Sequence, residues 1–179
     1  TETPVTTETT LKQDSSTCLF NNPDTSLSGI ILRDSETAEM VLRVKELLGD
    51  TSYYFSSKDR KQVLEVHVYP GDGISQVSYF KVGSTVSSGA KAASSSIAEF
   101  ISEKGVRIGT SKEELISLLR NCFTTKDSSA NAITLSYMLE QPADSKTGFL
   151  KRQNMPSYYA DYKFVDNKLS EFEFGFEYP

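Results

Sequence analysis

The C-terminal stretch YYADYKFVDNKLSEFEFGFEY, residues 158–178, decides the fold of this chain. Its two halves, 158–164 and 169–178, predict antiparallel strands, because Asp166 and Asn167 between them tolerate the left-handed backbone of a tight turn. In the last strand, aromatic residues alternate with glutamate or glycine. One face of the strand is therefore aromatic and the other largely acidic, as in a sheet that covers a helix on one side and meets solvent on the other. This pattern predicts the α+β fold class.

Other segments show the same period-two alternation. Residues 62–69 and 74–82 flank the turn sequence PGDG and predict a β-hairpin. Residues 132–139 predict a further strand of the same kind. The core-facing residues expected in the hairpin are Leu64, Val66 and Val68.

Two segments predict amphipathic helices. Between residues 36 and 48, apolar side chains recur at helical spacing, and Gly49 supplies a stop. A second helix is expected directly after residues 105–111. Its start offers two capping boxes, Thr110 with Glu113 and Ser111 with Glu114.

The two predicted helices follow similar sequences. GVRIGTS at 105–111 aligns without a gap on GIILRDS at 29–35. This similarity predicts two similar halves, each a helix packed on antiparallel strands, at residues 18–83 and 98–179. Residues 84–97 are rich in glycine, serine, alanine and threonine, and we interpret them as the linker between the halves.

The N-terminal residues and the cysteines indicate an exported protein. Residues 1–17 are almost entirely polar and cannot bury enough surface to fold, so we expect a disordered tether. The chain begins with threonine rather than methionine, which predicts a processed leader or an expression remnant. The two cysteines, Cys18 and Cys122, predict a disulfide in an oxidising compartment, with two buried thiols as the alternative. We expect a periplasmic or outer-membrane-anchored location.

Composition excludes several classes of protein. The 179 residues carry a formal net charge of -5, with 19 basic and 24 acidic side chains. A protein that neutralises phosphates needs a basic face, so no nucleic-acid partner is expected. No apolar run approaches the length of a membrane-spanning helix. Any contact with a membrane would therefore depend on an N-terminal lipid anchor that this chain does not contain.

The sequence contains no recognisable catalytic or metal-binding motif. His67 is the single histidine and is expected on the solvent face of its strand. With one histidine and two cysteines, zinc sites of the Cys₂His₂ or Cys₄ type are excluded by counting. Glu171, Glu173 and Glu177 share one strand face, but alternating glutamates on an outer strand are an ordinary solubility feature. We predict a protein that is not an enzyme and that has no catalytic residues, no cofactor and no metal.

Two pieces of the sequence resemble a known group of envelope proteins. GVRIGTSKEEL at 105–115 is similar to the entry to the helix in the small outer-membrane lipoprotein family that includes BamE, and in the related two-repeat fold of the β-lactamase inhibitor protein. The closing strands, 158–169, add to this resemblance, and the whole layout resembles exported proteins of gut Bacteroidetes. The resemblance implies a helical element packed on an antiparallel sheet, with surfaces that bind other proteins.

We therefore predict a non-enzymatic protein–protein interaction module whose partner is another envelope protein. The candidate partner-binding residues are Tyr158, Tyr159 and Tyr162, since tyrosine combines rigid contact area with a hydroxyl. The alternative for these tyrosines is a place in the core with hydroxyls at its rim. The alternative function is a small-ligand or glycan-binding module, for which exposed tyrosines would form a stacking platform.

Overall fold

The structure is a computed structural model that describes residues 20, 22–70, 75–85, 89–141 and 148–178. These residues form three helices and two sheets. The helices are α1 (Ser35–Leu42), α2 (Lys112–Leu119) and α3 (Phe149–Gln153). The strands are β1 (Ser26–Leu27), β2 (Ile30–Ile31), β3 (Thr51–Ser56), β4 (Val63–Pro70), β5 (Ser75–Gly83), β6 (Ala93–Ser94), β7 (Thr124–Lys126), β8 (Ala132–Glu140), β9 (Ser157–Val165) and β10 (Lys168–Glu177).

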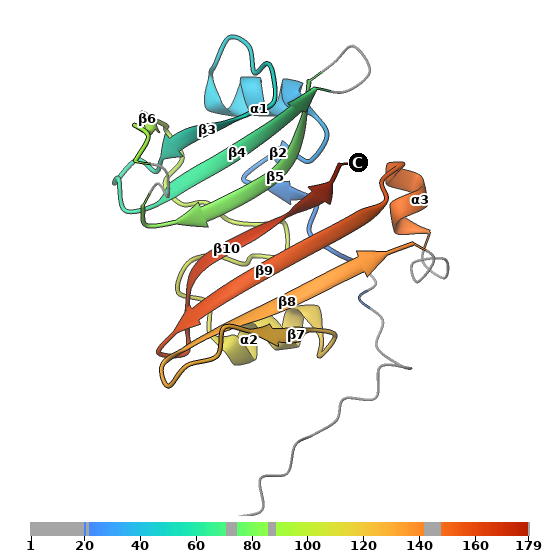
Figure 1. Ribbon diagram of the computed structural model, residues 1–179. Coiled ribbons are helices and arrows are strands. Elements are labelled where there is room, and N and C mark those ends of the chain that lie inside the picture. Colours follow the sequence, from blue (N-terminus) through green and yellow to red (C-terminus); the bar gives the residue numbers. More distant parts are fainter. Residues whose placement is uncertain (1–19, 21, 71–74, 86–88, 142–147, 179) are drawn as a thin grey trace, which may run out of the picture.

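One twisted sheet of eight strands organises the molecule (Figure 1). Its order is β6-β3-β4-β5-β10-β9-β8-β7, and neighbours are antiparallel except for β3 and β6. The chain therefore enters the centre of the sheet twice, once with β5 and once with β10. These two strands pair with each other and join the earlier strands of the chain to the later ones. The coarse α+β prediction is confirmed.

The hairpin predicted from the last residues of the chain is present. β9 and β10 pair from Ser157↔Glu177 to Val165↔Lys168. The turn residues Asp166 and Asn167 have φ values of 49° and 62°. Positive φ at both central positions is the type I′ geometry that matches the twist of antiparallel strands.

A single hydrophobic core lies on one face of the sheet. The predicted core residues Leu64, Val66 and Val68 of β4 are fully buried, as the alternation required. The buried apolar residues of α1 and α2 belong to the same cluster, so both helices cover this face. Figure 1 shows α2 behind β7 and β8.

The predicted start of α2 is confirmed, whereas α1 ends earlier than predicted. α2 begins as the second capping box predicts, with the Ser111 hydroxyl accepting from the Glu114 N–H at 3.2 Å. α1 is shorter than the predicted 36–48, because Arg43 adopts a left-handed backbone with φ of 55° and ends the helix after Leu42.

Residues 84–97 include structured backbone. β6 pairs with the outer strand β3, and the Ser95 N–H donates to the Ser56 carbonyl at 3.0 Å. The segment after β6 contributes to the core, because Phe100 and Val106 are fully buried. The boundaries at 84 and 97 stay a prediction, since sheet and core run through both predicted halves.

Candidate functional site: the open face of the sheet

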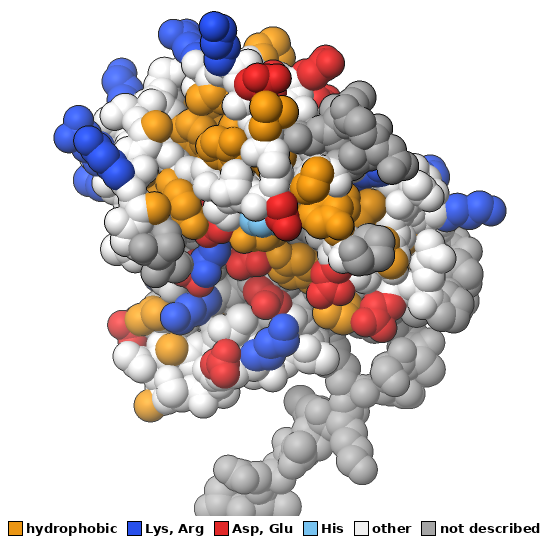
Figure 2. All heavy atoms as spheres, turned by 45° about the horizontal axis from the view of Figure 1, so that its top comes forward, with side chains coloured by type: hydrophobic (Ala, Val, Ile, Leu, Met, Phe, Trp, Pro, Cys, Tyr) orange, Lys and Arg blue, Asp and Glu red, His pale blue; other side chains and the backbone are white. Residues whose placement is uncertain are grey.

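The face of the sheet that turns away from the core carries polar and aromatic side chains. The strand pairing arranges these side chains in two rows across the sheet. Along each strand, the two rows are two residues apart. The first row runs over β4, β5, β10, β9 and β8 as Glu65, Lys81, Glu173, Asp161 and Ser136. The second runs over the same strands as His67, Tyr79, Gly175, Tyr159 and Met138. Figure 2 shows acidic side chains gathered across the middle of this face.

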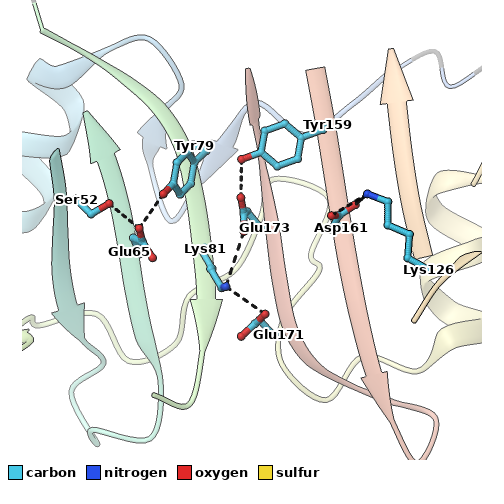
Figure 3. A network of polar contacts seen from close by, with 9 residues as sticks. All are labelled: Ser52, Glu65, Tyr79, Lys81, Lys126, Tyr159, Asp161, Glu171 and Glu173. Atoms are coloured by element: carbon cyan, nitrogen blue, oxygen red, sulfur yellow. Dashed lines mark hydrogen bonds and ion pairs between the residues drawn. The ribbon is translucent and has the colours of Figure 1, made fainter. Parts of the chain in front are cut away.

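Glu65 is held from two neighbouring strands (Figure 3). The Ser52 hydroxyl of β3 donates to its Oε1 at 2.6 Å, and the Tyr79 hydroxyl of β5 donates to the same oxygen at 2.8 Å. Burial raises the pKa of the Tyr79 hydroxyl well above its usual value, so Tyr79 remains a donor at physiological pH. The Glu65 carboxylate is therefore fixed in place.

Glu173 occupies the centre of the sheet and is held in the same way. The Tyr159 hydroxyl donates to its Oε1 at 2.6 Å, and the Lys81 ammonium lies 4.0 Å from its Oε2. Lys81 also pairs with Glu171 at 3.4 Å. Burial raises the pKa of the Glu173 carboxyl, and the hydrogen bond from Tyr159 and the charge of Lys81 oppose this rise.

Asp161 continues the row on β9. It accepts a short hydrogen bond from the Ser136 hydroxyl of β8, and Lys126 of β7 lies 3.4 Å from its Oδ2. These three neighbouring groups of contacts together form the polar network of the open face, which reaches from β3 to the edge strand β7. Figure 3 draws all of its members except Ser136. The network's formal charge is -2, because it contains four carboxylates and two ammonium groups. The carboxylates are those of Glu65, Asp161, Glu171 and Glu173, and the ammonium groups are those of Lys81 and Lys126.

A shallow hollow of about 550 Å³ lies at the C-terminal end of β10 on this face. Two ring pairs line it, Tyr69 with Tyr178 at a centroid distance of 4.4 Å, and His67 stacked on Tyr79 at 4.8 Å. Tyr159 contributes a fifth ring. The hollow is also lined by the carboxylates of Asp50 and Glu177.

The surroundings of His67 contain the residue types of a hydrolytic triad. Nδ1 lies 2.8 Å from the Ser78 hydroxyl, and Nε2 lies 3.4 Å from Asp50 Oδ1. Ser78, however, is only 4% exposed, and its hydroxyl also donates to the main-chain carbonyl of His67 at 3.2 Å. A nucleophile must reach its substrate, so this contact is better explained as a link between β4 and β5 where their register shifts.

The three tyrosines predicted to bind a partner separate into two groups. Tyr158 and Tyr162 are 0% and 1% exposed, because alternate residues of β9 face the core. Tyr158 donates its hydroxyl to the Asp24 carbonyl at 2.8 Å. Neither residue is available to a partner in this structure. Tyr159 alone points to the open face, where it joins the network described above.

The predicted Cys18–Cys122 disulfide falls partly outside the described residues. Cys122 is disulfide-bonded and packs at the edge of the core. Cys18 is not among the described residues, so the pairing itself stays a prediction.

The sequence analysis missed Glu65, Tyr79 and Lys81 as members of a site. Each lies on the solvent-facing side of a predicted strand, so the alternation contained part of the signal. The missing information was the pairing of β5 with β10, which brings residues 81 and 173 together. Pairing between strands so distant in sequence has no local signature.

Comparison of the chain with protein-family models, with curated proteins and with solved structures gives no significant match. Among the described residues, no three or more histidine, cysteine, aspartate or glutamate side chains converge as a possible metal site. None of the helices formed by the described residues is both long and apolar enough to cross a membrane.

Proposed function

We propose that this chain is a non-enzymatic protein of the cell envelope that binds another protein through the open face of its eight-stranded sheet. The observation that carries the proposal is the row of hydrogen-bonded tyrosines and carboxylates across that face. Helices α1 and α2 cover the opposite face, and no described helix covers this one.

The physical properties of the face suit protein recognition. Tyr79 and Tyr159 are half-buried, and their hydroxyls are fixed on Glu65 and Glu173. Rings already held in one orientation lose little entropy on binding. Tyrosine is enriched among the residues that dominate binding energy at interfaces.

The polar residues 1–17 and the pair Cys18 and Cys122 support the envelope location. A tether of that composition would space a folded domain from a lipid anchor, and a disulfide suits an oxidising compartment. We therefore propose that the protein is exported and is either periplasmic or anchored at the outer membrane.

The strand order supports the further proposal of a duplicated unit. α1 is followed by β3, β4 and β5, and α2 is followed, after β7, by β8, β9 and β10, with the short helix α3 between β8 and β9. The third strands of the two series, β5 and β10, pair antiparallel at the centre of the sheet. This arrangement suits the two-repeat fold of the β-lactamase inhibitor protein and the lipoprotein family that includes BamE.

Capture from solubilised envelope extract of the source organism tests the proposed function. The bait variant is Tyr79→Ser/Tyr159→Ser, which removes two rings from the open face. The matched control is Met40→Ser/Leu118→Ser, because these apolar side chains are 72% and 42% exposed on α1 and α2. Circular dichroism first establishes that both variants are folded.

The expected result is a stoichiometric partner that binds the parent chain and the control, and that the Tyr79→Ser/Tyr159→Ser variant loses. Its complex should re-form from the two purified proteins. A partner that binds all three chains equally would contradict the proposal.

The hollow beside Tyr159 favours one second function, a small-ligand or glycan-binding module. Its aromatic lining would stack on the apolar face of a sugar ring. Binding of a glycan to the parent chain, with no protein captured after gentle crosslinking, would favour this alternative.

A further inference from the structure

We propose that the hollow at the C-terminal end of β10 receives a cationic side chain, lysine or arginine, of the protein partner. This inference rests on the proposed function and names the chemistry by which the open face would recognise its partner. Its occupant is a basic protein surface with one side chain inserted in the hollow.

The lining of the hollow suits a cation because aromatic rings surround it. Tyr69 and Tyr178 form one wall, and the stacked rings of His67 and Tyr79 form another. The faces of aromatic rings carry negative charge density and attract ammonium and guanidinium groups.

Carboxylates place negative charge at the hollow. Asp50 and Glu177 belong to its lining, and the neighbouring network across the sheet carries a formal charge of -2. Glu177 is held by the Ser157 hydroxyl at 2.7 Å, so its carboxylate is already positioned. An anionic group would be repelled here, whereas a cation would gain both carboxylates and rings.

The basic groups near this hollow are already engaged. Arg33 lies beside the Tyr178 hydroxyl but is not part of the lining, and its guanidinium is held in place by donating to the Gln76 side chain and to the Gln153 carbonyl. These acceptors are neutral, so Arg33 keeps its positive charge and offsets part of the negative charge of Asp50 and Glu177. His67 contacts Asp50 and is cationic only when protonated. Within the described part of the chain, the other lining carboxylate, Glu177, has a contact only with the neutral Ser157 hydroxyl, so it is the group left for an incoming cation.

The size of the hollow limits what can enter it. A shallow depression of about 550 Å³ has room for one or a few side chains but not for a folded segment. The rest of the contact would therefore spread over the polar row on β4, β5, β10 and β9, where a basic surface would meet Glu65, Glu173 and Asp161.

Titration with small cationic probes tests the inference without the partner. The probes are N-acetyl-lysine methylamide and N-acetyl-arginine methylamide, and the neutral control is the Nε-acetylated form of the first. Aromatic ¹H–¹³C NMR spectra of the full chain follow the tyrosine and His67 ring signals at pH 7.5 in low salt.

We expect saturable shifts of the rings of Tyr69, Tyr79, Tyr159 and Tyr178 with either cationic probe, and none with the neutral control. Glu177→Gln and Tyr159→Leu should each weaken probe binding about two- to fivefold, the range for one exposed charge or ring contact. Lys163 lies on the same face but outside the hollow, so Lys163→Gln should leave the affinity for the probes unchanged.

The inference is overturned if the neutral probe binds as well as the cationic ones, or if none of them shifts these rings. The two proposals fail separately. Partner capture that still depends on Tyr79 and Tyr159, together with no probe binding, would remove the cation site and leave the proposed function standing. Probe binding, together with a partner whose capture does not depend on Tyr79 and Tyr159, would leave the cation site standing and remove the proposed function.

Discussion

Replacing Gly175 with alanine tests how closely the two central strands must approach. Gly175 lies opposite Tyr79 in the pairing of β10 with β5. A Cβ built at this position would lie 2.3 Å from the Ser78 carbonyl oxygen, 2.4 Å from the Tyr79 Cβ and 2.6 Å from the Tyr79 Cα. Carbon atoms in ordinary contact are about 3.5–4.0 Å apart. The methyl group therefore fits only if β5 and β10 move apart.

The size of the effect follows from which atoms must move. All three are backbone atoms or a Cβ, so no side-chain rotation relieves the overlap. Overpacking a well-packed interior costs about 1–3 kcal/mol, and a backbone clash belongs at the upper end of that range. For a chain of this size, about 3 kcal/mol lowers the melting temperature by about 6–12 °C.

Gly83→Ala is the matched control, because Gly83 lies on the same strand pair. Its added Cβ would meet only the flexible Glu171 side chain, with the nearest atom at 3.4 Å. A change between about 0 and 1 kcal/mol in either direction is expected, since alanine also restricts the unfolded chain. Thermal unfolding of parent and both variants, followed by circular dichroism, measures the difference. Equal melting temperatures for Gly175→Ala and Gly83→Ala would refute the argument from close approach.

Three further predictions concern single side chains and the predicted disulfide. Burial raises the pKa of Asp24 from 3.8 to about 6, so its contribution to stability is complete below pH 3.8 and is lost as the pH rises through about 6, a difference of about 3 kcal/mol. Asp24→Asn should therefore raise the melting temperature at pH 7.5 and have little effect at pH 3.5, and parallel pH profiles for parent and variant would count against this assignment. Tyr158→Phe should cost about 1–3 kcal/mol because it leaves the buried Asp24 carbonyl without its donor. Tyr162→Phe should be neutral or stabilising, because the buried Tyr162 hydroxyl has no hydrogen-bond partner among the described residues. The reverse order in urea denaturation would contradict the assigned hydrogen bonds. Peptide mapping without reductant should recover Cys18 linked to Cys122, and Cys122→Ser should lower stability by about 2–5 kcal/mol; two free thiols in the native protein would exclude the bridge.

Most of the sheet could be predicted from alternation alone. Phe172, Phe174 and Phe176 are buried while Glu171 and Glu173 face outwards, because side chains of a strand alternate between its two faces. The end of α1 could not be predicted in this way. Arg43 takes a backbone conformation with positive φ that is unusual for arginine, and no glycine marks the position.

The candidate site was less predictable than the fold. The alternation along β9 places Tyr158 and Tyr162 on one face with Ala160 and Phe164, and Tyr159 on the other face with Asp161 and Lys163, but it does not say what covers each face. The answer depends on β9 lying between β8 and β10 with Tyr158 and Tyr162 beneath it, where Tyr158 contacts Phe149 and Phe176. Tyr159 then falls on the open face beside Glu173.

The affinity of the purified partner for matched variants tests the central claim, that the open face of the sheet is the binding surface. Isothermal titration calorimetry compares the parent chain with Tyr79→Ser/Tyr159→Ser and with Met40→Ser/Leu118→Ser. The account predicts that the first variant weakens binding by at least about tenfold, or about 1.4 kcal/mol, while the second stays within about twofold of the parent. Equal affinity for the parent and the Tyr79→Ser/Tyr159→Ser variant, with a loss in the helix-face variant, would place the binding surface on the opposite side of the molecule and contradict the account.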